Sequence, residues 1–148
     1  MPNPDLSAEQ VRDLRALAGF IIPPSAGYDV PGADDDRIFG DILRSLERDR
    51  DDIRRALVLL AALAGGAFAD LGPERRTEVA TTFREAGGAP LTALVRVVLL
   101  CYYRDDRVMR SLGQEPRPPF PKGHVVEQGD WSLLDPVRAR SRMYRLVD

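Results

Sequence analysis

The fold depends chiefly on the segment Pro90-Leu-Thr-Ala-Leu-Val-Arg-Val-Val-Leu-Leu-Cys-Tyr-Tyr103. Its apolar residues recur at the spacing of a helix with one buried stripe, formed by Leu91, Leu94, Val95, Val98, Cys101 and Tyr102. In the second half, further apolar residues occupy the other sides: Val97, Leu99, Leu100 and Tyr103. A helix of this kind has to be covered on more than one side. The sequence therefore predicts that neighbouring helices of this chain, or another polypeptide, complete the coverage.

On the N-terminal side of this stretch, short apolar-striped segments alternate with glycine and proline. Ser7 followed three residues later by Gln10 has the spacing of a capping box, and Pro23-Pro24 should end the helix that begins there. Gly72-Pro73 is typical of a helix end followed at once by a helix start. We predict an all-α fold, an irregular bundle of about five to six helices. These helices are expected to begin near Ser7, Asp36, Ile53, Arg75, Pro90 and Asp105.

An acidic run and a glycine pair in this region each allow two interpretations. Asp34-Asp35-Asp36 lacks the alternating acidic residues, central glycine and terminal glutamate of an EF-hand, so we interpret it as a helix cap and not as a calcium loop. Gly65-Gly66 interrupts the apolar helix predicted over Ile53 to Leu71 and weakens it by about 2 kcal/mol relative to two alanines. We expect these glycines where another backbone packs closely or where the helix bends.

After Gly113 the chain becomes rich in proline and loses any helical pattern. We therefore divide the chain into a helical domain over residues 1–113 and a long, extended C-terminal tail over residues 114–148. The tail is too apolar to be a disordered linker, since burial of Trp131 alone would remove about 150–250 Å² from water. We expect the tail to dock on a partner chain, with its arginines either meeting acidic groups there or lying in solvent. The residues assigned to partner binding are Val97, Leu100, Tyr103, Phe120, Trp131, Leu133, Leu134, Arg138, Arg140 and Tyr144.

Residues that carry enzyme chemistry are scarce in this sequence. The sole cysteine, Cys101, lies inside the apolar helix and is interpreted as a small core residue; together with the sole histidine, His124, it lacks the signature of a nucleophilic pair. One cysteine and one histidine are too few for an ordinary zinc site. No glycine-rich phosphate-binding loop occurs. We predict no catalytic residue, no cofactor-binding residue and no metal ligand on this chain.

Charge and hydropathy exclude two further kinds of partner. The net charge of -2, with no long block of one sign, argues against nucleic acid. The longest uncharged run, Ala56 to Ala69, is shorter than the roughly 20 residues that a transmembrane helix needs. We predict no nucleic-acid partner and no transmembrane segment. Because the N-terminus as written has no apolar export signal, we also predict a cytoplasmic location.

Several short motifs follow one another in a recognisable order. They are Leu17-Ala-Gly-Phe-Ile-Ile-Pro-Pro24 with a Gly/Pro loop and an acidic stretch after it, Phe68-Ala-Asp-Leu71 before a Pro-Glu helix start, Phe83, the Pro90 helix with Tyr102-Tyr103, and Ser111-Leu-Gly113 before a proline-rich end. Their order and spacing resemble the gluconate 2-dehydrogenase subunit 3 family. Proteins of that family are small subunits of flavin-dependent sugar and alcohol dehydrogenases, whose large subunit belongs to the glucose-methanol-choline oxidoreductase group.

The resemblance covers Val11 to Gly113 and implies a helical, non-catalytic subunit that binds and stabilises the flavoprotein chain. FAD and the catalytic base would belong to that partner, and an electron-acceptor protein would be reached through it. Family members often carry a twin-arginine leader, so a periplasmic location follows if the partner carries the leader or if it has been removed. Two alternatives stay open: a free-standing helical adaptor, and an enzyme in its own right that uses Cys101 or His124.

Overall fold

The computed structural model describes residues 6–117 and 127–141. It divides the chain into two units, residues 1–116 and 117–148. Helices and short turns dominate both, and within the described residues the only β-type pairing is an isolated bridge between Ser25 and Val30. The predicted all-α fold is confirmed. The predicted path of the proline-rich stretch over residues 118–126 lies outside the described residues.

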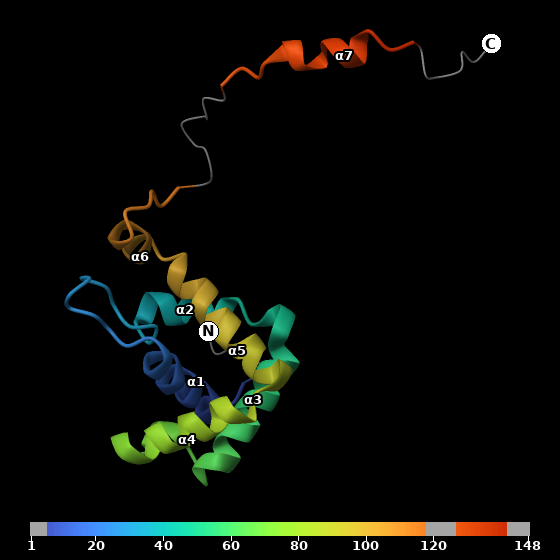
Figure 1. The fold of residues 1–148 in the computed structure, drawn as a ribbon. Helices are drawn as coiled ribbons and strands as arrows, with labels where there is room; N and C mark the ends of the chain where they lie inside the picture. The colour runs from blue at the N-terminus through green and yellow to red at the C-terminus, as the bar shows by residue number, and fades with distance from the viewer. Residues whose placement is uncertain (1–5, 118–126, 142–148) are drawn as a thin grey trace. The chain divides into compact units, whose positions relative to one another are not determined.

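The first unit contains six α-helices and two 3-10 turns in its described part (Figure 1). The helices are α1 (Ala8–Ile21), α2 (Asp36–Arg44), α3 (Arg50–Ala64), α4 (Pro73–Ala86), α5 (Gly88–Tyr103) and α6 (Asp106–Ser111), and the turns are η1 (Glu47–Asp49) and η2 (Phe68–Asp70). The second unit contains η3 (Trp131–Leu134) and α7 (Asp135–Arg138). The sequence predicts no helix in this part of the tail, and the structure corrects that prediction. Asp130 caps η3 and Pro136 occupies the first turn of α7, and both favour a helix start.

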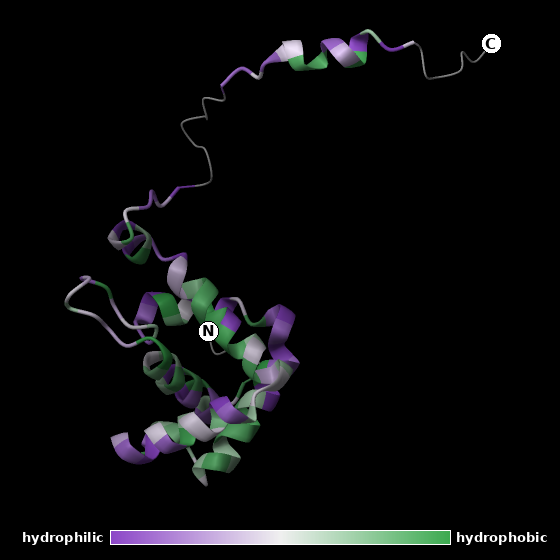
Figure 2. Ribbon diagram, in the orientation of Figure 1, coloured by the Kyte–Doolittle hydropathy of each residue, from purple (hydrophilic) through white to green (hydrophobic). Residues whose placement is uncertain are grey.

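Helix α5 packs against α3 and α2, and α3 in turn packs against α4. Much of α5 is coloured as hydrophobic in Figure 2. Its inner side places Leu94, Val98 and Cys101 in a continuous core, where each is at most 1% exposed. The largest fully buried side chains that complete this core from other elements are Leu14, Ile38, Ile42, Leu46, Ile53, Leu57, Leu60, Phe68 and Val108.

Side-chain caps fix the starts of three helices. The Ser7 hydroxyl accepts a hydrogen bond from the Gln10 amide, and the Gln10 side chain accepts one from the Ser7 amide, so the predicted capping box is confirmed. Asp35 caps α2 by accepting from the amides of Arg37 and Ile38, as the acidic run predicts. Asp105 caps α6 by accepting from the amide of Arg107.

The glycine pair at residues 65 and 66 ends a helix, and both interpretations offered from the sequence are wrong. Helix α3 stops at Ala64 rather than continuing to Leu71, because Gly65 adopts a left-handed conformation with φ of 71°. Its amide donates back to the carbonyl of Ala62, and the amide of Gly66 to that of Ala61. A Cβ at either glycine would meet no atom within 4 Å, so no other backbone packs there.

We predict that Gly65→Ala lowers the free energy of unfolding by about 1 kcal/mol, because an alanine is strained in the left-handed region. The matched control is Gly27→Ala, at an exposed loop position where φ is not positive and a Cβ would have no neighbour closer than 4.0 Å. That change should leave stability within about 0.5 kcal/mol. Urea unfolding of both variants checks the pair. Equal effects would contradict the conformational explanation.

The motif Phe68-Ala-Asp-Leu71 forms η2, which is anchored from two helices. Phe68 is fully buried. The Asp13 carboxylate of α1 accepts from the Ala69 amide at 2.9 Å. From α4, the Arg76 guanidinium donates to the carbonyls of Ala69 and Leu71 at 2.8 and 3.0 Å and lies 5.7 Å from the centre of the Phe68 ring. The short turn therefore connects α1 and α4 through side-chain hydrogen bonds.

Candidate functional site

One side of α5 is apolar and exposed. Leu99, Leu100 and Tyr103 are 37%, 60% and 53% exposed, although they belong to the most apolar helix of the chain. The predicted binding residue Val97 lies on the covered side of α5. Its side chain is only 5% exposed, so it is a core residue and not part of a surface. Other elements of the first unit cover the buried side of α5. No other described part of the first unit covers its exposed side.

The exposed side of α5 continues into two shallow depressions. One is lined by the apolar residues Leu91, Val95, Leu99 and Leu100, together with Thr92 and Arg96. The other lies between α1, α4 and α5 and is lined by Leu17, Phe20, Ile21, Ala80, Phe83, Arg84, Leu91 and Val95. Because both contain Leu91 and Val95, they form one surface, which we call the apolar strip. Leu100 was predicted as a binding residue and lies in this strip, whereas the contribution of Phe20, which is 40% exposed, was not predicted.

The second unit presents its own apolar side chains on a short, capped helix. The Asp130 carboxylate accepts hydrogen bonds from the hydroxyl and the amide of Ser132, which lower the pKa of Asp130. The helical turns that follow hold exposed side chains at the predicted positions Trp131, Leu133 and Leu134, and also at Val137.

Among the predicted arginines of the second unit, Arg138 is exposed and pairs with Asp135 at 3.2 Å. Arg140 is also exposed. The predicted binding residues Phe120 and Tyr144 lie outside the described residues, as does His124. Seven tail positions were assigned to partner binding, and the structure describes five of them: Trp131, Leu133, Leu134, Arg138 and Arg140.

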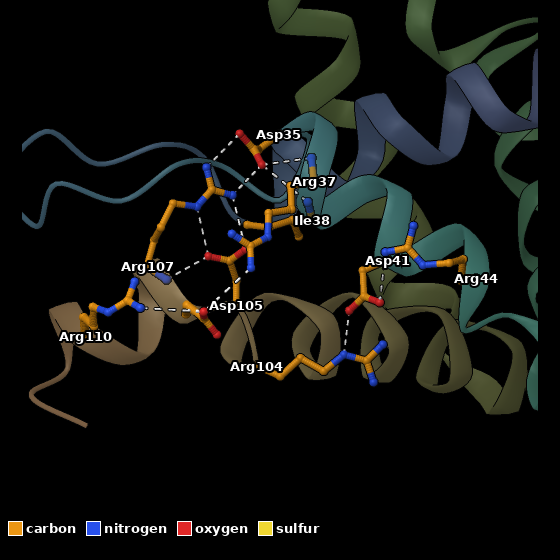
Figure 3. Close-up of polar contacts among 10 residues, drawn as sticks. Asp35, Arg37, Ile38, Asp41, Arg44, Arg104, Asp105, Arg107 and Arg110 are labelled. Atoms are coloured by element: carbon orange, nitrogen blue, oxygen red, sulfur yellow. Dashed lines mark hydrogen bonds and ion pairs between the residues drawn. The ribbon is translucent and has the colours of Figure 1, made fainter. Parts of the chain in front are cut away.

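A cluster of ion pairs joins the start of α2 to the start of α6 (Figure 3). The Arg107 guanidinium donates to both carboxylate oxygens of Asp35, at 2.6 and 3.2 Å, and to Asp105 at 2.9 Å. Arg37 lies 3.6 Å from the same Asp105 carboxylate, whose side chain is only 4% exposed. Asp35 and Asp105 thus share Arg107, which lies 72 residues after Asp35 in the sequence. Each of the two carboxylates also caps a helix.

The charges of this cluster shift one another's pKa values. The hydrogen bond from Arg107 lowers the pKa of Asp35. Burial alone would raise the pKa of Asp105, but its hydrogen bonds to Arg107 outweigh burial and lower it. The hydrogen bonds to Asp35 and Asp105 raise the pKa of Arg107. Asp35, Asp105 and Arg107 are therefore held in their charged forms, which suits a structural clamp and not proton transfer at neutral pH.

Cys101 lies on the buried side of α5, beside a second ion pair. Burial raises the pKa of its thiol, so it is not held as a reactive thiolate. The neighbouring Arg104 donates to Asp41 at 2.6 Å and to the Ser45 hydroxyl at 2.5 Å. Across residues 6–117 and 127–141, no group of three or more His, Cys, Asp or Glu side chains is arranged to hold a metal ion.

Comparison with protein-family models, with curated proteins and with solved structures finds no match to this chain.

In the described part of the chain, no single helix is long and apolar enough to cross a membrane. Helices α4 and α5 reach the required length and hydropathy only when taken together, and they meet at a bend of 118°.

Proposed function

We propose that this chain is a non-catalytic small subunit that binds and stabilises the flavin-dependent catalytic subunit of a sugar or polyol dehydrogenase. The observation that carries the binding role is the exposed apolar side of α5, with Leu100 60% and Tyr103 53% exposed. Exposed apolar surface of this kind is typical of protein–protein interfaces. The class of partner is supported by the order of sequence motifs that resembles the gluconate 2-dehydrogenase subunit 3 family.

The polar groups of the described residues also support a binding role over a catalytic one. The buried carboxylates Asp13 and Asp105 are used in hydrogen bonds to a backbone amide and to Arg107, and the thiol of Cys101 is buried. FAD and the redox chemistry are assigned to the partner, and we attribute no step of that chemistry to a residue of this chain. We propose a cytoplasmic location, or a periplasmic one if the partner carries an export leader or if a leader has been removed from this chain.

A free-standing helical adaptor is the second candidate, and the continuous core of the first unit favours it. Removal of residues 127–148 separates the two functions. For a small subunit, the shortened chain should lose the flavoprotein during gentle purification from source cells, whereas the full chain should retain a yellow partner. For an adaptor, no flavin-bearing chain should accompany either form, and the deletion should alter only the stability of the monomer.

We predict that Trp131→Ala weakens binding of the flavoprotein subunit by more than about 2 kcal/mol, because a large exposed aromatic side chain is the typical energetic centre of an interface. Trp131 is 58% exposed on its short helix. The control Tyr28→Ala removes an aromatic side chain that is 74% exposed in the loop before α2 and should leave the affinity unchanged. Titration of the isolated subunits checks both variants. Unchanged affinity for Trp131→Ala would show that the partner binds elsewhere.

A further inference from the structure

The apolar strip consists of regularly spaced apolar side chains and contains few polar groups. Leu91, Val95 and Leu99 follow one another at intervals of four residues, so they form a single ridge along α5. Phe20, which is 40% exposed, flanks this ridge from α1, and the buried Phe83 of α4 lies beneath the same depression. A second helix packs against such a surface by placing its own apolar side chains, three or four residues apart, beside the ridge.

The polar groups that line the strip are satisfied within the chain, with one exception. The Thr92 hydroxyl donates to the Gly88 carbonyl at 3.0 Å, and Arg96 pairs with Asp49 at 2.6 Å. Arg84, which is exposed at the edge of the strip, has no ion pair with any described residue. A partner segment that covers the strip would approach this guanidinium, and burial of an unpaired charge is unfavourable. A carboxylate on the partner would remove that penalty and fix the orientation of the segment.

We propose that the apolar strip binds an amphipathic helix of the flavoprotein subunit, with its apolar face on the ridge of Leu91, Val95 and Leu99 and an aspartate or glutamate beside Arg84. This inference rests on the proposed function, since it names the surface and the partner element of the same complex. The charge at Arg84 distinguishes this occupant from a purely aliphatic surface. The partner helix then covers the side of α5 that the first unit leaves open.

The test uses the tagged full chain in source cells, with a photo-crosslinking amino acid at position 99 or, as a control, at position 58. Two charge changes accompany it, Leu100→Asp and Arg84→Glu. Their controls are Val58→Asp, at a side chain 59% exposed against 60% for Leu100, and Arg48→Glu, at an exposed arginine; neither Val58 nor Arg48 lines the strip. Bound flavin is read from the absorbance of the purified complex, and the crosslinked peptide is identified by mass.

We expect position 99 to crosslink to an amphipathic, acidic helix of the flavin-bearing chain. Leu100→Asp should weaken the complex at least tenfold and Arg84→Glu several-fold, while both controls stay within twofold. A yellow complex could form equally well with Leu100→Asp and crosslink only from position 58. That result would contradict the strip as the binding surface but would leave the proposed function standing. A preparation without a flavin-bearing chain would overturn the proposed function and, with it, this inference. Crosslinks between two copies of this chain, or binding of lipid vesicles that Leu100→Asp abolishes, would overturn the flavoprotein helix as the occupant.

Discussion

Phe68→Ala should lower the free energy of unfolding by about 4 kcal/mol, the largest effect that we expect from a single substitution. The ring is fully buried in η2, between α1 and α4, and its removal leaves a cavity that neighbouring side chains cannot readily fill. It also removes the surface over which the Arg76 guanidinium lies. Urea unfolding of the full chain, followed by the helical circular dichroism signal, measures the change.

Phe20 provides the matched control, because it is also a phenylalanine but is 40% exposed on α1. Phe20→Ala should lower the free energy of unfolding by about 1 kcal/mol. If Phe68→Ala does not fold, Phe68→Leu should fold with a smaller loss, since it retains most of the buried volume. A loss for Phe68→Ala no greater than that for Phe20→Ala would contradict the placement of η2 in the core.

Arg107→Met should lower the free energy of unfolding by about 3 kcal/mol, because it removes the shared partner of two helix-capping carboxylates. The Asp105 side chain is 4% exposed, so its charge would remain in a poorly solvated place with Arg37, 3.6 Å away, as its nearest cation. The control Arg110→Met lies on the same helix, where Arg110 is 61% exposed and 3.6 Å from Asp106. That surface pair should contribute less than about 0.5 kcal/mol.

The Arg107 clamp also predicts how the stability difference between wild type and Arg107→Met depends on pH. The folded state lowers the pKa values of Asp35 and Asp105 below 3.8, so the unfolded chain binds more protons in acid. The stabilisation is fully present above pH of about 4 and is lost as the pH falls through the lower folded values. The stability difference between wild type and Arg107→Met should therefore shrink below pH of about 4. A difference that grows in acid would contradict the clamp.

Much of the fold could be predicted from local patterns. The capping box at Ser7 and the acidic cap at Asp35 depend on neighbouring residues, and both were predicted correctly. The prediction that the helix continues past Gly65 was wrong. In a sequence, a glycine that ends a helix cannot be distinguished from one that only weakens it, because the φ angle is not known. The turns at residues 131–138 were missed because four-residue helices are too short to show a period.

The candidate site could be predicted only in part, because sequence periodicity does not say which side of a helix its own chain will cover. All sides of the second half of α5 are apolar, so Val97 and Leu100 look equivalent, yet Val97 is buried and Leu100 is exposed. The Arg107 clamp joins residues 72 positions apart, and no local signal marks it. Arg84 lies at the edge of the strip without an ion pair to any described residue, and this too depends on tertiary contacts.

The most direct test of a binding subunit is sedimentation velocity on the gently purified, tagged full chain, recorded both in the protein band and in the flavin absorption band. We predict a single boundary, heavier than the 16.4 kDa chain, that absorbs in both bands. In that species a second polypeptide would cover the exposed side of α5. A colourless boundary at the mass of one chain, monodisperse and stable at high concentration, would contradict the claim that this helix is completed by a flavoprotein.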